Sequence, residues 1–214
     1  MQLGLNGRRV AILATDGVEQ VELEEPRKAL DGAGAITQIV APKAGTIQGM
    51  NHDEKADSLT VDRTLADAHA SDFDALLLPG GVANPYTLRM DQAAVQFVRE
   101  LMLADKPVAA ICHGPWLLVE AGALEGRRLT SWPSLKTDIR NAGGEWVDDT
   151  VVVDDRLVTS RKPADIPAFN AAVLREFAGR MDDRQVDELS EQSFPASDPP
   201  PTPTAIGGEG AART

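Results

Sequence analysis

The chain has 214 residues, a formal net charge of −12 and a single cysteine. This length suits one α/β domain of ordinary size or two small ones. The negative charge disfavours binding to a phosphate backbone, so we expect no nucleic-acid partner, and one cysteine excludes an internal disulfide. No apolar run approaches the ~20 residues that span a bilayer, and residues 1–10 lack the apolar segment of a signal peptide. We therefore expect a soluble cytoplasmic protein that does not bind membranes.

The first part of the chain is predicted to alternate strands and helices. Its strands are uninterrupted apolar runs, as in a parallel sheet covered on both faces. The intervening helix contains Pro26, which suits a first turn, and Gly32 and Gly34, which suit a helix end. The predicted ranges are strands at 8–15 and 36–42, the helix at 21–34 and an excursion at 46–62 that is typical of a hairpin.

The second part continues the alternation. A strand at 73–81 ends in two glycines, and residues 91–105 have an apolar face at helical spacing. The order of elements implies a mostly parallel sheet with helices on both faces. The remaining predicted elements are a strand at 107–112, a helix at 113–122, a strand at 127–132, a helix at 133–144, two short strands within 145–160 around an Asp154–Asp155 turn, and a final helix at 164–180.

The composition changes near residue 181. Residues 1–180 carry clustered apolar side chains and are predicted to form one α/β domain, whereas residues 195–214 have almost no large apolar side chain beyond Ile206. Such a segment cannot bury enough surface to offset the entropy of ordering. We therefore predict a disordered or extended, acidic and Pro-rich tail at 181–214.

Cys112 ends the predicted strand at 107–112. Cysteine is among the most often buried residue types, so an inert core position is one interpretation. The alternative is a nucleophile, because ligands bind at the carboxyl ends of parallel strands, and a helix amino terminus behind a sharp turn favours the thiolate. Gly80 and Gly81 end the preceding strand, where they form either a tight turn or, with the N–H of His113, an oxyanion hole.

Four segments in the same order resemble the PfpI family of the ThiJ/PfpI superfamily: DGVEQVELEEP, LLLPGG, AICHGP and LTSWPSLKTDIRNAGGEWVDDTVVVDDRLVTSRKPAD. The resemblance covers roughly residues 8–178. It implies a flavodoxin-like three-layer α/β sandwich of the class I glutamine amidotransferase type, assembled as a homodimer or larger homo-oligomer. It also implies one of the family's functions, which are intracellular protease, glutathione-independent glyoxalase, protein deglycase and stress protein.

The resemblance assigns the site residues one by one. Cys112 matches the family's nucleophile, and Glu22 matches the glutamate that approaches this cysteine. His113 matches the adjacent histidine and Gly81 the oxyanion-hole glycine. Glu19 lies three residues before Glu22 and is expected to line the pocket.

Two of these residues have alternative interpretations. A buried Glu22 stays protonated and donates a hydrogen bond to the thiolate, which lowers the pKa of Cys112; from the residues alone, Glu22 is a solvated side chain in an acidic run. His113 need not reach the sulfur, because consecutive side chains at such a turn diverge, and its alternative role is to move a substrate proton.

His52 and His69 have polar surroundings typical of the surface. Three dispersed histidines and one cysteine lack metal-ligand spacing, so we predict no metal and no cofactor.

Tyr86 departs from the family pattern. Protease-type members have an acidic residue at this position, which reaches across a subunit interface to orient the histidine. Tyrosine carries no negative charge at neutral pH and cannot stabilise an imidazolium as a carboxylate does, which argues against strong peptidase activity. No histidine follows His113, so the glutaminase chemistry of true class I amidotransferases is also disfavoured.

The leading hypothesis is a cofactor-independent stress-response enzyme in which Cys112 adds to the aldehyde of methylglyoxal, glyoxal or an early glycation adduct. The alternative within enzymes is a PfpI-type intracellular peptidase that uses the same nucleophile on peptides. A third hypothesis, of another class, is a redox-sensing or chaperone-like protein that depends on oxidation of Cys112 to the sulfinic acid.

Overall fold

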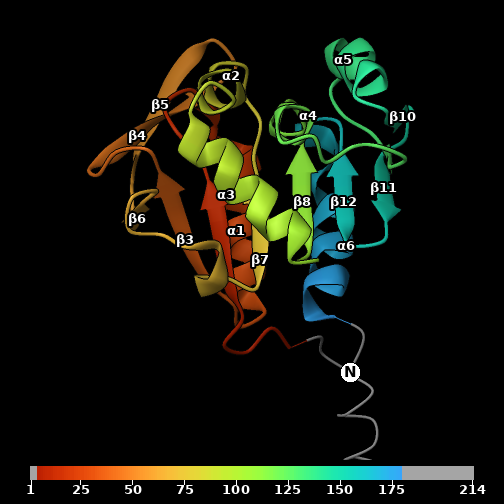
Figure 1. The fold of residues 1–214 in the computed structure, drawn as a ribbon. Helices are drawn as coiled ribbons and strands as arrows, with labels where there is room; N and C mark the ends of the chain where they lie inside the picture. The colour runs from red at the N-terminus through yellow and green to blue at the C-terminus, as the bar shows by residue number, and fades with distance from the viewer. Residues whose placement is uncertain (1–3, 180–214) are drawn as a thin grey trace, which may run out of the picture. The chain divides into compact units, whose positions relative to one another are not determined.

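A seven-stranded sheet forms the centre of the computed structural model, which describes residues 4–179 (Figure 1). Every neighbouring pair of strands is parallel except the edge pair β11–β12. The tail predicted at 181–214 lies outside the described residues. In spatial order the strands are β11 (Val151–Asp154), β12 (Leu157–Ser160), β8 (Val108–Ile111), β7 (Ala75–Leu78), β1 (Arg9–Leu13), β3 (Ile36–Ala41) and β6 (Arg63–Thr64).

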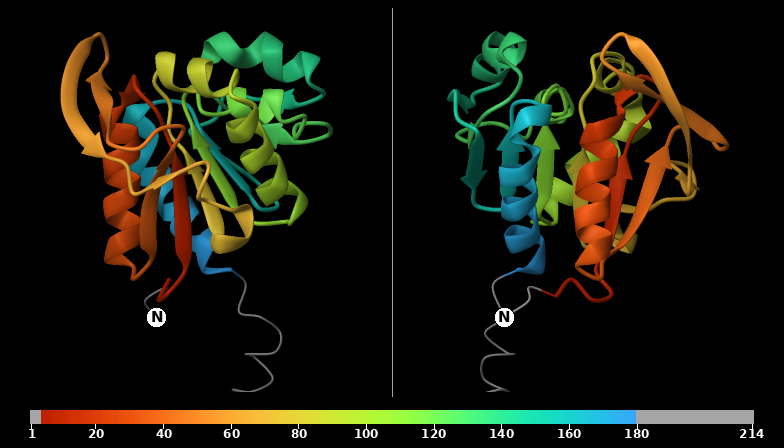
Figure 2. Two further views of the ribbon diagram at one scale, coloured as in Figure 1. Left: turned by 60° about the vertical axis from the view of Figure 1, so that its left-hand side comes forward. Right: turned by 180° about the vertical axis from the view of Figure 1, so that it is seen from behind.

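Helices cover both faces of this sheet, because the buried strands are apolar on both sides. Along β1, Ala11 and Leu13 pack into one core with α3 (Gln92–Leu103) and α4 (Trp116–Glu120). Val10 and Ile12 pack into the other core, beneath α1 (Gln20–Gly32) and α6 (Ile166–Ala178). Helices α1 and α6 contact each other on that face, as Figure 2 shows from behind. The predicted three-layer α/β sandwich is confirmed.

Two smaller sheets flank the carboxyl ends of the central strands. The hairpin expected within 46–62 is formed by β4 (Thr46–Asn51) and β5 (Glu54–Thr60), and β4 also pairs with the short β2 (Val18–Glu19). In the other sheet, β9 (Arg128–Leu129) pairs with β10 (Glu145–Trp146). Between β9 and β10 lie a 3₁₀ turn (Pro133–Leu135) and α5 (Lys136–Asn141).

One local expectation was wrong, and one short helix was not predicted. Pro26 lies inside α1 rather than in its first turn, because the helix already begins at Gln20, directly after the β2–β4 pairing. Helix α2 (Ala83–Leu88) was not predicted, since its residues form no apolar stripe of useful length. This short helix follows Gly81 and therefore shapes the chain next to Cys112. Among residues 4–179, no helix combines the length and apolarity that crossing a bilayer requires.

Candidate active site

Cys112 occupies a strained turn at the end of β8. Its φ of 59° is in the left-handed region, which is rare for a residue other than glycine and is typical of a nucleophile held on a strand-to-helix turn. Its backbone N–H donates to Ser160 O at 3.0 Å, and its carbonyl accepts from the N–H of Trp132 at 2.8 Å. Two segments distant in sequence thus hold the turn in place.

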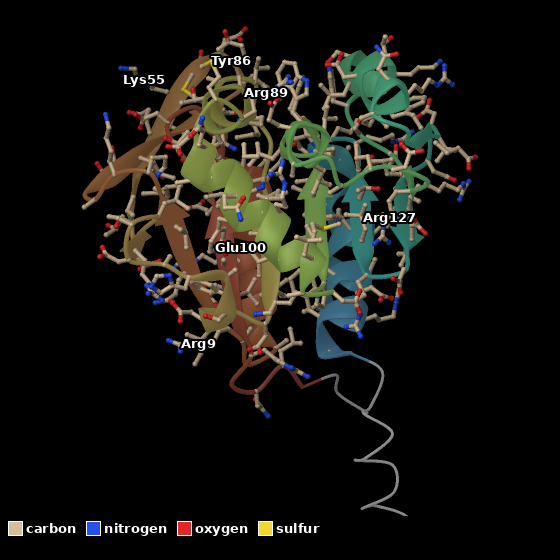
Figure 3. The ribbon with its side chains drawn as sticks, viewed as in Figure 1. Arg9, Lys55, Tyr86, Arg89, Glu100 and Arg127 are labelled. Atoms are coloured by element: carbon tan, nitrogen blue, oxygen red, sulfur yellow. The ribbon has the colours of Figure 1, made fainter. Side chains whose placement is uncertain are left out.

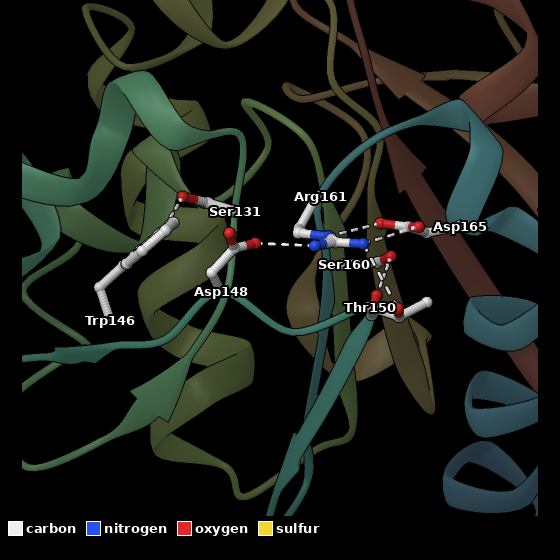
Figure 4. A network of polar contacts seen from close by, with 7 residues as sticks. All are labelled: Ser131, Trp146, Asp148, Thr150, Ser160, Arg161 and Asp165. Atoms are coloured by element: carbon white, nitrogen blue, oxygen red, sulfur yellow. Dashed lines mark hydrogen bonds and ion pairs between the residues drawn. The ribbon is translucent and has the colours of Figure 1, made fainter.

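The end of β12 is held in turn by Arg161. The Arg161 guanidinium donates to Asp148 Oδ1 at 2.7 Å and to Asp165 Oδ2 at 2.9 Å, as Figure 4 shows. Ser160, whose carbonyl receives the Cys112 N–H, also donates from Oγ to Thr150 O at 2.7 Å. Cys112 therefore sits on a braced part of the sheet.

Gly80 brings Glu22 next to Cys112. Its N–H donates to Glu22 Oε2 at 3.0 Å, and a Cβ at position 80 would lie 2.4 Å from that oxygen and 2.7 Å from Cys112 Cβ. Only glycine fits between the carboxyl and the thiol. The N–H of Gly80 already donates to Glu22. The remaining candidates for oxyanion donors are therefore the N–H groups of Gly81 and His113. Gly81 has a φ of 80°, and a Cβ there would lie 2.3 Å from Gly17 O.

Glu22 is fully buried, which raises its pKa to about 8. Interaction with the Cys112 side chain lowers this pKa in part, and the negative charge of Glu19 raises it. Within the described residues, Glu22 Oε1 has no hydrogen-bond partner. Glu22 thus carries a proton at neutral pH, as expected, and can donate it to a group that enters the site.

The thiol of Cys112 has a raised pKa, so the lowered value expected from the sequence is wrong for the site without substrate. Burial is the largest cause, since only 7% of the residue is exposed, and the charge on an ionised Glu22 adds to it. The backbone N–H groups of His113 and Gly81 act in the opposite direction because they hydrogen-bond the sulfur. Their role as an oxyanion hole stays a prediction.

His113 reaches the sulfur after all. Its Nδ1 lies 3.3 Å from Cys112 Sγ, and its Nε2 lies 3.2 Å from Ser134 Oγ. The ring is stacked on Trp132 and tilted against Trp116, with both centroid distances at 6.0 Å. Burial lowers the pKa of the imidazole, which keeps it neutral and able to accept a proton.

These groups open into one cavity of about 560 Å³. Its lining includes Cys112, His113, Glu22, Glu19 and Gly81, so the structure brings together five of the residues singled out in the sequence. Residues at the site that the sequence did not identify include Trp132, Ser134 and His52. His52 was expected at the surface, and its side chain is exposed; its backbone N–H nevertheless donates to Glu19 Oε2 at 3.1 Å at the cavity mouth.

Tyr86 is the exception among the candidate residues. It lies on α2 with about half of its surface exposed, its ring 6.3 Å from that of Trp116, and it does not line the cavity (Figure 3). In the part of the chain that the structure describes, no carboxylate bonds His113, and no three His, Cys, Asp or Glu side chains are arranged as metal ligands. The absence of a metal stays a prediction.

The fold and the site together define a class of protein. Its members have a flavodoxin-like sheet, and a cysteine in a strained turn lies beside a buried glutamate and a histidine. The family model described as the DJ-1/PfpI family matches residues 8–176, and the chain belongs to this family. This confirms the resemblance that the four sequence segments indicated.

Relatives share most of the chain. General stress protein 18 of Bacillus subtilis is 47% identical over 170 residues, which are 78% of this chain and 96% of that protein. Protein/nucleic acid deglycase 2 of Escherichia coli is 42% identical over 170 residues, with the same shares of 78% and 96%.

Solved structures show the same fold. A two-domain protein of Anabaena variabilis with DJ-1/ThiJ/PfpI-like and ferritin-like domains matches with a TM-score of 0.74 and 36% identity over 78% of this chain. The match spans about half of that longer protein, 47% of its length. DJ-1beta of Drosophila melanogaster matches with a TM-score of 0.73 and 28% identity, over 87% of this chain and 97% of that one.

Proposed function

We propose that this protein is a cysteine-dependent enzyme that converts reactive dicarbonyls, or their early adducts on amino groups, to hydroxy acids without a cofactor. One observation carries the proposal. The Cys112 thiol, a protonated Glu22 and a neutral His113 line the same cavity, and Gly81 lines it beside them. Addition to an aldehyde needs a nucleophile, a proton acceptor and hydrogen-bond donors for the developing oxyanion.

The first step uses the short distance between Cys112 and His113. The thiol proton passes to His113 Nδ1 as the sulfur forms a bond to the aldehyde carbon, and the carbonyl electron pair moves to oxygen. That oxygen accepts hydrogen bonds from the N–H groups of Gly81 and His113 and takes up a proton, which gives a hemithioacetal. The thiol ionises only as the bond forms, so its raised resting pKa is compatible with reaction.

The second stage moves protons between the two substrate carbons. Loss of the proton on the former aldehyde carbon and gain of one on the ketone carbon convert the hemithioacetal to a hydroxyacyl thioester. Water then hydrolyses the thioester, which returns the thiol and releases lactate when the substrate is methylglyoxal. Glu22 and His113 are the groups within reach that carry or accept these protons.

The relatives support this choice of substrate. The Escherichia coli protein is named a protein/nucleic acid deglycase and the Bacillus subtilis protein a general stress protein, which fits removal of carbonyl adducts under stress.

The peptidase alternative is weaker, because His113 has no acidic partner among the described residues and Tyr86 lies outside the cavity. A redox sensor needs a thiol that is ionised at rest, whereas burial raises the pKa of Cys112. We further propose that the protein is cytoplasmic and forms homo-oligomers, as the family resemblance implies.

The test is formation of lactate from methylglyoxal by the wild type and by Cys112→Ala. Lactate must be measured directly, because any thiol or amine traps the aldehyde reversibly. We expect lactate from the wild type only, together with regeneration of unmodified N-acetylarginine from its methylglyoxal adduct. If neither folded protein forms lactate or regenerates N-acetylarginine, the proposal is wrong, and cleavage of peptides and then oxidation of Cys112 are the next assays.

A further inference from the structure

Both ring nitrogens of His113 have partners within this chain. Nδ1 lies 3.3 Å from Cys112 Sγ and Nε2 lies 3.2 Å from Ser134 Oγ, so the imidazole bridges the nucleophile and a serine hydroxyl. Trp132 is stacked on the ring and Trp116 is tilted against it, and both restrict its rotation. A histidine held in this way by a third group has the geometry of a catalytic base with an orienting partner.

The segment that carries Ser134 is attached to the nucleophile itself. The N–H of Trp132 donates to Cys112 O at 2.8 Å, and the following 3₁₀ turn begins with Pro133, whose ring restricts the backbone. Ser131 adds a second attachment, since its Oγ donates to Trp132 O at 2.9 Å and accepts from Trp146 Nε1 at 3.0 Å (Figure 4). Ser134 is thus placed by a braced turn rather than by a free loop.

We propose that Ser134 is the positioning residue of His113: its Oγ accepts a hydrogen bond from Nε2–H, so that Nδ1 is free to take the proton of Cys112; this inference rests on the function proposed above. The assignment follows from the donors and acceptors present. A protonated thiol donates to Nδ1, so a neutral imidazole must carry its hydrogen on Nε2 and donate it to Ser134 Oγ. After proton transfer the imidazolium carries hydrogens on both nitrogens, and Ser134 still accepts the same bond.

A serine in this place also explains how the site works without a carboxylate on His113. The hydroxyl fixes the tautomer but carries no charge, so it stabilises the imidazolium less than an aspartate does. The proton therefore returns readily from Nδ1 to the substrate. This property suits the repeated proton transfers of the dicarbonyl reaction. It suits peptide cleavage less, because there the imidazolium must persist until a poor leaving group departs.

The test uses Ser134→Ala in the full chain, with Thr137→Ala as the control. Ser134 and Thr137 are both exposed, and both substitutions remove one hydroxyl from the same part of the chain. The ¹⁵N spectrum of labelled histidine reports which ring nitrogen is protonated, and loss of a signal in His113→Gln assigns it among the three histidines. We expect the Nε2–H tautomer in the wild type and Thr137→Ala, and a mixture of tautomers in Ser134→Ala.

Lactate formation gives the second readout. Loss of one neutral hydrogen bond predicts a kcat about fivefold lower in Ser134→Ala, with KM little changed. In Ser134→Asp the added carboxylate raises the pKa of His113 and shifts the acidic limb of the kcat profile to higher pH. An Nδ1–H tautomer in the wild type, or the wild-type tautomer in Ser134→Ala, would overturn the role of Ser134. The spectra decide this even if no protein forms lactate, in which case only the proposed function fails.

Discussion

Glu22 makes the stability of the protein depend on pH, because a fully buried carboxyl has its pKa raised from 4.5 to about 8. Between these values the folded state holds a proton that the unfolded state releases. The contribution of Glu22 to stability is therefore complete below pH 4.5 and is lost as the pH rises through about 8. We expect the free energy of unfolding of the wild type to fall, relative to Glu22→Gln, by up to about 1.4 kcal/mol per pH unit across this range.

Urea unfolding at pH 5, 6.5 and 8 measures this difference. The matched control is Glu25→Gln, which changes an exposed carboxyl on the same helix and should leave the pH dependence of the wild type intact. A constant difference between the wild type and Glu22→Gln at all three pH values would show that Glu22 does not hold a proton in the folded state.

At the scale of single residues, the sequence located the groups that belong to recognisable turns. Cys112 and Gly81 are at strand ends, where the pattern of apolar runs places them, and the family resemblance added Glu22. Ser134 and Trp132 were not identified, because they reach the site from a segment whose position depends on tertiary hydrogen bonds such as that from Trp132 N–H to Cys112 O. No local pattern encodes such a contact.

Among the elements, β12 has a structural role that its sequence does not reveal. Arg161 at its end joins the Asp148–Thr150 segment to the start of α6, and Asp165 is a buried carboxylate that receives two of its hydrogen bonds. Arg161→Gln leaves that carboxylate without a cation, so we expect a loss of about 2–4 kcal/mol in the free energy of unfolding. Because Ser160 O accepts the Cys112 N–H, loosening this network should expose the buried thiol, so we also expect faster alkylation of Cys112 by iodoacetamide.

Arg156→Gln is the control for this prediction. Arg156 pairs with Asp105 at 2.9 Å, but both side chains are largely exposed, so removing the pair should cost less than about 1 kcal/mol. Chemical unfolding of both variants compares the two costs directly. Equal losses would mean that the network around Arg161 adds nothing beyond a surface ion pair.

Element types were predictable where the apolar period was long, as in α3 and α6. Shorter elements were less so. Helix α2 contains Pro85 and has one exposed face, and it forms because Asn84 accepts from the N–H of Thr15 and donates to the carbonyls of Pro79 and Gly80. These bonds join three segments and cannot be inferred from the sequence of α2.

At the scale of the whole molecule, the alternation of strands and helices sufficed to predict a parallel sheet. The order of the four segments that resemble the PfpI family identified the family of the protein. The whole chain has a net charge of −12, and the cavity is acidic as well, since its lining among the described residues includes Glu19 and Asp53 and no lysine or arginine. An Escherichia coli relative is named for both protein and nucleic acid substrates. Acidic side chains at the cavity repel the phosphate of a nucleotide.

We expect the protein to prefer adducts on cationic or neutral amines over adducts on nucleotides. With methylglyoxal adducts of N-acetylarginine and of a guanine nucleotide, release should be about tenfold faster from the arginine adduct at low salt. The ratio of the two release rates should fall at 0.5 M salt and in Asp53→Asn. In Asp149→Asn, which changes an exposed carboxylate that does not line the cavity, the ratio should keep its wild-type value. Equal rates at low salt would mean that contacts to the base outweigh the repulsion of its phosphate. Substrate choice would then be set inside the cavity by the shape around Cys112 rather than by charge at its mouth.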